Sequence, residues 1–229
     1  GGFAVSNAVY NISNSVVSGC SVFSSFQGST GATVNFSNVT ANCGTISLQN
    51  GGMAVNFIDS HVTASSMLVK CDFMGSECNS AFSKTSSGSS SIACSHSTNG
   101  SYCDLFYRVA QGSSVSMTDS MSITNSTISC GNRCRGFSYI EPSNVDQTSN
   151  TKTAAFTLTL SGNTWTYPNG ETQRRPTSGT NWTAGGVLGV DTASFETSAP
   201  TANWLYSFRN TGSNKYITVN PSVTYLDGN

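Results

Sequence analysis

The stretch Val34-Asn35-Phe36-Ser37-Asn38 alternates apolar and polar side chains and ends on an asparagine. The same pattern, apolar-x-apolar-x-polar, recurs at places that begin with Tyr10, Val55, Ile92, Val115 and Leu158. Alternation with a period of two predicts β-strands that bury one face. Because the copies recur along residues 1–166, the repeat decides the fold prediction.

The spacing of the copies predicts a solenoid. Successive copies lie 24, 21, 37, 23 and 43 residues apart. A βαβ unit needs about 30 residues, whereas a repeat of about 20–25 suits one coil of two or three short strands. We interpret the 37-residue step as one coil with a long loop, and residues 67–71 are a candidate segment of that longer coil. The 43-residue step is close to two coils, and residues 137–140 are the candidate for the missing copy.

Stacking the copies predicts three columns of side chains, and two of them face a shared interior between strands about 4.8 Å apart. The first inner column contains Tyr10, Val34, Val55, Ile92, Val115 and Leu158. The second inner column contains Ile12, Phe36, Phe57, Cys94, Met117 and Leu160. The third column contains Asn14, Asn38, Asp59, His96, Asp119 and Gly162. It lies at strand ends, where Asn and Asp tolerate left-handed backbone and cap turns.

With this repeat, residues 1–166 resemble the right-handed parallel β-helix superfamily, which includes pectate-lyase-like enzymes, phage tailspikes and surface adhesins. Phe36-Ser37-Asn38, followed by Gly51-Gly52, is also similar to the short Phe/Asn and Gly-Gly repeats of bacterial polymorphic surface proteins. The predicted fold is all-β, a single-stranded parallel β-helix of about 6–8 rungs with a small C-terminal β cap or assembly element. No catalytic signature of any one of these families is present, so the resemblance implies no site residues.

Residues 167–229 lack the repeat and contain four prolines, Pro168, Pro176, Pro200 and Pro221. Strand candidates here are residues 204–208, 215–219 and 222–226. They are expected to form a small antiparallel cap or to pair with another subunit, because an open β edge recruits other chains. We therefore predict a second, strand-rich segment for capping or assembly.

Composition narrows the class of protein. The 229 residues include 41 Ser, 27 Thr and 22 Asn, and only 9% are charged, with a net charge of -1. Such residues favour strands and turns over helices. Without a Lys/Arg cluster, no nucleic-acid partner is expected. No stretch is apolar and long enough for membrane insertion. The start at Gly1 without Met indicates a processed product or a fragment of a longer protein.

An even number of cysteines predicts disulfides in an oxidising compartment. Three close pairs are Cys71/Cys78, Cys94/Cys103 and Cys130/Cys134, and Cys20/Cys43 is a fourth, one repeat apart. Free, buried cysteines are the alternative. No C-x-x-C spacing is present, so neither a metal site nor any other cofactor is expected.

Catalytic residues are few. Asp59 and Asp119 fall in one predicted column with His96 between them, and a carboxylate–imidazole–carboxylate line is a candidate for acid–base cleavage of a glycan. The alternative is a turn ladder in which the Asn and Asp members of this column do one structural job. His61 is interpreted as an exposed strand residue.

Sugar binding needs aromatic faces and hydrogen-bonding side chains. The candidates are Trp165, Tyr167, Trp182, Trp204 and Tyr206. Core or interface packing is the alternative for each of them. Candidate glycosylation acceptors are Asn99, Asn125 and Asn181, although the number of sequons is what this composition yields by chance.

These patterns favour a non-enzymatic structural or adhesion module that is extracellular or lies on a cell or virion surface. Its expected partners are a glycan or cell-surface ligand and further copies of itself, as a trimer or a filament. Two alternatives stay open. One is a tailspike-like polysaccharide depolymerase, a hydrolase or lyase. The other is a filament subunit that uses its tail strands for β-augmentation.

Overall fold

The computed structural model describes residues 7–27, 31–49, 53–72, 77–95, 103–109, 116–130, 134–140, 152–166, 186–187 and 217–225. These residues form strands and turns, which confirms the all-β prediction. No helix long and apolar enough to span a membrane occurs among them. The strands up to residue 94 are β1 (Val9–Gln27), β2 (Thr33–Gln49), β3 (Met53–Ile58), β4 (His61–Asp72), β5 (Glu77–Ser83) and β6 (Ser91–Cys94). The later strands are β7 (Cys103–Val109), β8 (Ser116–Thr124), β9 (Thr127–Cys130), β10 (Cys134–Ile140), β11 (Lys152–Ser161), β12 (Thr164–Thr166), β13 (Gly186–Val187) and β14 (Ile217–Tyr225).

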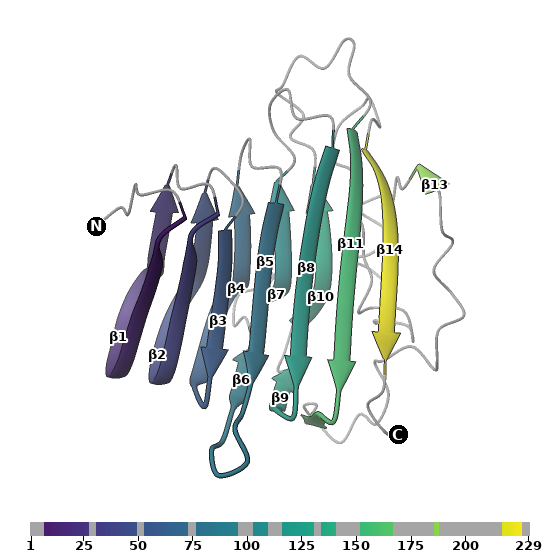
Figure 1. The fold of residues 1–229 in the computed structure, drawn as a ribbon. Coiled ribbons are helices and arrows are strands. Elements are labelled where there is room, and N and C mark those ends of the chain that lie inside the picture. The colour runs from purple at the N-terminus through teal and green to yellow at the C-terminus, as the bar shows by residue number, and fades with distance from the viewer. Residues whose placement is uncertain are drawn as a thin grey trace.

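The strands form one curled sheet in which all pairs are parallel except the antiparallel pair β13–β14 (Figure 1). Three series of pairings run through it. Ladder A contains the first parts of β1 and β2, then β3, β5, β8, β11 and β14. Ladder B contains the middle parts of β1 and β2, the first part of β4, and then β6, β9 and β12. Ladder C contains the last parts of β1, β2 and β4, then β7 and β10.

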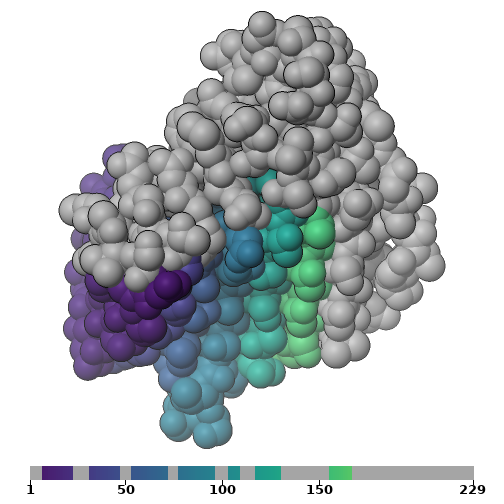
Figure 2. All heavy atoms as spheres, turned by 45° about the horizontal axis from the view of Figure 1, so that its top comes forward, coloured from purple at the N-terminus to yellow at the C-terminus, as the bar shows by residue number. Residues whose placement is uncertain are grey.

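Alternation decides which side chains face the interior. In β3 and β5 every second residue is buried, as the apolar pattern predicts. Phe36, Phe57 and Phe82 follow one another across β2, β3 and β5 in register. Their rings are stacked, with centroids 4.7 Å and then 5.0 Å apart. Aromatic contacts thus fill the space between neighbouring strands. Figure 2 shows the strands as successive coloured bands from the N-terminus onward.

The register corrects the predicted inner columns. The first contains Tyr10, Val34, Val55, Ser80, Met121 and Leu158. The second contains Ile12, Phe36, Phe57, Phe82, Ile123 and Leu160.

Ile92 and Cys94 were therefore placed wrongly, because they belong to ladder B. Met117 was also placed wrongly, because it lies four positions before Met121 in β8 and pairs with Ala154. Several segments share the same alternation, so the pattern by itself does not say to which ladder a copy belongs. Val115 lies outside the described residues.

The corner between ladders A and B is made by single residues with left-handed backbone. Their φ angles are 52° at Asn14, 54° at Asn38, 50° at Asp59, 52° at Asn125 and 68° at Gly162. The turn column was thus predicted correctly at four positions, whereas Asn125 stands where Asp119 was expected. His96 lies outside the described residues. Asn and Asp accept this backbone because their short polar side chains bond locally.

At two corners, the residue after the left-handed position bonds backbone groups of the preceding coil through its side chain. Ser60 Oγ accepts the Val39 N–H at 3.1 Å. Asn163 has the same role three strands further on: its Oδ1 accepts the Ser126 N–H at 2.9 Å and its Nδ2 donates to the Ile123 carbonyl at 2.7 Å. Buried backbone groups at the turns thereby keep their partners.

Three predicted disulfides are confirmed. Cys20–Cys43 joins register partners on β1 and β2. Cys71–Cys78 joins the end of β4 to the start of β5, and Cys94–Cys103 joins β6 to β7. The side chains of Cys130 and Cys134 lie outside the described part of the structure. Three disulfides are typical of a protein that is secreted or otherwise outside the cytoplasm.

In the tail, β14 pairs in parallel with β11, so this segment extends the same sheet. Only the short pair β13–β14 is antiparallel among the described strands. The strand candidate at residues 204–208 lies outside them.

We expect Phe57→Ala to lower the free energy of unfolding by about 3–5 kcal/mol, because the substitution leaves a cavity between two stacked rings. Denaturant titration followed by circular dichroism measures the loss. Thr157→Ala, an exposed position of the same ladder, is the control and should change stability by no more than about 0.5 kcal/mol. Equal effects of the two substitutions would contradict the stacked interior.

Candidate functional site

The candidate catalytic carboxylates lie far apart. Ile58 pairs with Ser83, and Phe82 pairs with Ile123, so the counterpart of Asp59 near β8 is Asn125. Asp119 lies six residues before Asn125, and six strand residues span about 20 Å. Glycosidase carboxylates are separated by about 5–9.5 Å. The register therefore overturns the predicted line through Asp59 and Asp119.

Asp119 instead faces the interior. Its side chain is buried and lies 3.6 Å from Arg108, measured from Nε to Oδ2. Arg108 pairs in register with Cys71, and Asp119 pairs with Cys78. The ion pair thus repeats, one strand further on, the link that the Cys71–Cys78 disulfide makes between ladders C and A. Burial and pairing indicate a structural clamp for these two charges.

Removing one charge of this clamp should be costly. We expect Asp119→Ala to lower the free energy of unfolding by about 3–5 kcal/mol, because Arg108 loses its buried counter-charge. The double variant Arg108→Met/Asp119→Leu should recover most of that loss, since it removes both charges of this ion pair together. Denaturant titrations of both variants test this, and a double variant less stable than Asp119→Ala would contradict it.

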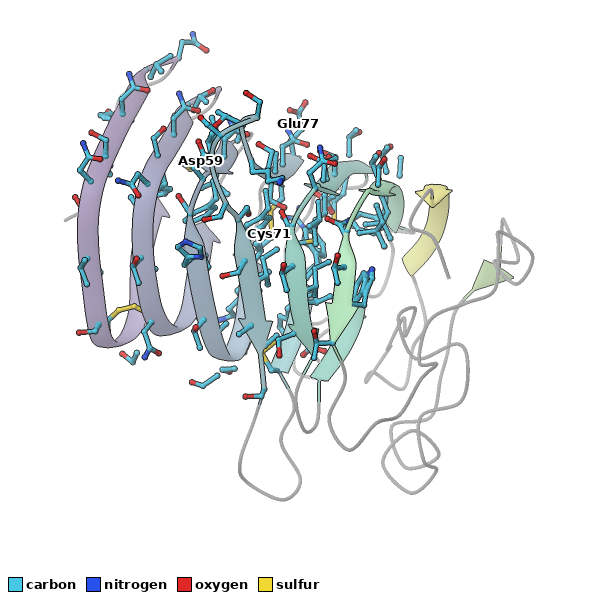
Figure 3. The ribbon with its side chains drawn as sticks, turned by 90° about the horizontal axis from the view of Figure 1, so that it is seen from below. Asp59, Cys71 and Glu77 are labelled. Carbon is cyan, nitrogen blue, oxygen red and sulfur yellow. A yellow bond between two sulfur atoms is a disulfide. The ribbon has the colours of Figure 1, made fainter. Side chains whose placement is uncertain are left out.

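Asp59 has a local role. Its carboxylate accepts the Thr85 N–H and the Thr85 hydroxyl, each at 2.8 Å. A Cβ on Gly88 would overlap this carboxylate, so glycine is needed for the close approach. Residues 84–90, here called the anchored loop, therefore fold against Asp59. The loop protrudes beyond the ends of the neighbouring strands between β5 and β6 (Figure 1), and Figure 3 labels Asp59.

His61 holds the other end of the anchored loop. Its Nδ1 lies 2.7 Å from Ser91 Oγ, and its Nε2 lies 3.3 Å from Ser89 Oγ. The ring is exposed, as the sequence analysis expected. In the described residues no carboxylate bonds this ring, which argues against a serine–histidine–acid arrangement.

The anchored loop gives a sharp test. Asp59→Gly keeps the left-handed backbone, removes the carboxylate, and should speed trypsin cleavage after the exposed Lys84. Mass spectrometry of the peptide that begins at Thr85 measures the rate. Asn125→Gly makes the same change at the corresponding turn, and it should leave this cleavage rate unaltered. An unchanged rate in Asp59→Gly would show that the carboxylate does not hold the loop.

The outer surface of ladder B carries a regular array of small polar side chains, here called the hydroxyl face. Its first column contains Val16, Thr40, His61, Ser91, Thr127 and Thr164. Its second column contains Ser18, Asn42, Thr63, Ala93, Ser129 and Thr166. Eight of these twelve residues are Ser or Thr, and none is Asp, Glu, Lys or Arg. Figure 3 views the molecule from below, where the short strands of this ladder lie.

The hydroxyl face is well supported. Between its two columns lie Ala41, Val62, Ile92 and Ile128, all buried in the core. The register of ladder B has no shift between Val16–Ser18 of β1 and β12, whereas shifts occur in the turn toward ladder C. A rigid core below and an unbroken register give the outer side chains fixed positions.

The sequence analysis did not find this face, although a signal for it exists. A three-residue stretch with polar side chains at its first and third positions begins two residues after each of four turn-column positions. These stretches are Thr40-Ala41-Asn42, His61-Val62-Thr63, Thr127-Ile128-Ser129 and Thr164-Trp165-Thr166. The signal becomes visible only once the turn column has the correct members, because the wrong choice of Asp119 hides Thr127 and Ser129.

Trp165 is the predicted sugar-binding aromatic that the structure describes. It pairs with Ile128 and packs against the core, half-buried. Tyr167, Trp182, Trp204 and Tyr206 lie outside the described residues. Of the glycosylation candidates, Asn125 lies exposed at a turn, and Asn99 and Asn181 are not described.

No group of three or more His, Cys, Asp or Glu side chains that could hold a metal ion occurs in the described part of the chain. Comparison with models of known protein families, with curated proteins and with solved structures found no match to this chain. The candidate site therefore stands on its own geometry.

Proposed function

We propose that the chain is an extracellular parallel β-helix that serves as a structural or adhesion module, with the hydroxyl face as its recognition surface. The order of the ladders supports the solenoid: the chain passes through A, B and C in turn and then returns to A, as in β3, then β4, then β5. Each return places a strand beside the previous one, which is the arrangement of stacked coils.

The absence of an assembled catalytic pair supports a non-enzymatic role. In the part of the chain that the structure describes, Asp59 holds a loop and Asp119 is buried beside Arg108. Neither carboxylate lies where an acid and a base could flank a sugar bond. The hydroxyl face, by contrast, is broad, uncharged and exposed at most of its positions. This face is the single observation that carries the proposal.

A second role, self-assembly, is favoured by β1. Tyr10 and Ile12 are only half-buried, whereas their register partners Val34 and Phe36 are fully buried. Val9 and Val16 are also exposed. No charged residue and no proline occurs before Asp59, so β1 lacks two of the features that commonly protect a sheet edge. We propose that this edge accepts another strand, in a trimer or a filament, and light scattering tests the oligomer.

Incubation with candidate polysaccharides should release no new reducing ends, because Asp59 and Asp119 lie too far apart to cleave a glycan together. Retention of the intact protein on insoluble polysaccharides or on cells measures binding in the same samples. Asp59→Asn and Asp119→Asn variants complete the test. Release of reducing ends that either substitution abolishes would overturn the non-enzymatic proposal in favour of a depolymerase.

A further inference from the structure

The hydroxyl face has two fixed spacings. Neighbouring members of a column are register partners on adjacent strands, so they repeat at about 4.8 Å. The two columns are two residues apart along each strand, which is about 6.6–6.8 Å. Six strands share this arrangement from β1 to β12. The face is thus a two-dimensional lattice, and eight of its twelve positions are Ser or Thr.

The hydroxyls of this lattice are available to a ligand. Within the described residues, the side chains of Thr40, Thr63, Thr127 and Thr164 make no hydrogen bond to other protein groups. Threonine is stiff at χ1, so each hydroxyl and methyl is held in place at little further entropic cost.

The outer surface of ladder A is different. There the Asn35 amide donates to Asn11 Oδ1, and the Asn56 amide donates to Asn35 Oδ1, both at 2.9 Å. Ser120 likewise donates to Asn79 Oδ1 at 2.7 Å. These amide and hydroxyl groups bond one another along the stack, so this part of the outer surface of ladder A is already hydrogen-bonded within the protein. It provides matched control positions on the same fold.

The chemistry of the hydroxyl face narrows its ligand. It carries no Lys or Arg, so phosphates and acidic polymers find no permanent positive charge to bind. It presents no outward Phe, Tyr or Trp on which a sugar ring could stack, because Trp165 packs against the core. Once charged ligands and stacked sugar rings are excluded, the face fits a flat partner that repeats in two directions. Such a partner must offer a hydrogen-bond donor and an acceptor at each point of its lattice.

We propose that this partner is crystalline water, and that the hydroxyl face binds ice. Water oxygens on the prism planes of hexagonal ice repeat along two axes at lengths close to the two spacings of the face. Each hydroxyl can take the place of a lattice water, and each threonine methyl can lie between waters without bonding them. The inference rests on the proposed stack of coils, because only an extended parallel register multiplies one weak contact across six strands.

The test uses the intact chain with its disulfides. Growth of a single ice crystal in its solution is followed on a temperature-controlled stage, and the gap between the melting and growth temperatures is measured. The native protein should open such a gap and shape the crystal into facets. Thr127→Lys and Thr63→Lys should each abolish both effects, because a long charged side chain lifts the face off the lattice.

Thr157→Lys is the matched control, since Thr157 is an exposed threonine on the outer surface of ladder A. It should keep the full temperature gap, and circular dichroism and melting curves should show all variants folded. A folded native protein without any gap overturns the ice inference. If Thr157→Lys also abolishes the temperature gap, the effect belongs to another surface, and the ice inference for the hydroxyl face is overturned. Retention on insoluble polysaccharide without a gap overturns ice binding while supporting the adhesion module.

Discussion

Parallel pairing in register, with strands about 4.8 Å apart, is the constraint on which the rest of this molecule depends. It places each side chain directly beside the equivalent side chain of the next strand. In the interior this produces the stacked rings of Phe36, Phe57 and Phe82. On the outside it produces the asparagine series of ladder A and the hydroxyl face of ladder B. The same spacing therefore supplies both the stability of the sheet and the regularity of its surface.

Register also explains how different chemistries serve one structural purpose. The link between the end of ladder C and the start of ladder A is a disulfide at Cys71–Cys78 and an ion pair at Arg108–Asp119 on the next strands. A disulfide restrains the unfolded chain. A buried ion pair adds specificity of arrangement, since its charges are stable only together. Asp119, which stands out in the sequence for its charge, is thus part of this link between ladders C and A.

The turn column was largely predictable, because a left-handed residue must be Asn, Asp or Gly and these stand out among apolar pairs. Asn14, Asn38 and Asp59 were found in this way. The later members were harder, since Met117-Thr118-Asp119 and Met121-Ser122-Ile123-Thr124-Asn125 both fit the pattern. The choice of the wrong one created an apparent catalytic column and concealed the hydroxyl face.

From the sequence alone, the strands, the parallel stacking, three disulfide pairs and most left-handed turns followed, because each depends on residue type and local spacing. The tertiary structure alone decided which strand lies beside which. Ile92 and Phe82 are both apolar residues in alternating segments, yet one belongs to ladder B and the other to ladder A. Alternation specifies the face that a side chain takes, whereas its neighbours depend on loop lengths and on packing between distant segments. A surface that spans six strands is therefore visible only in the folded chain.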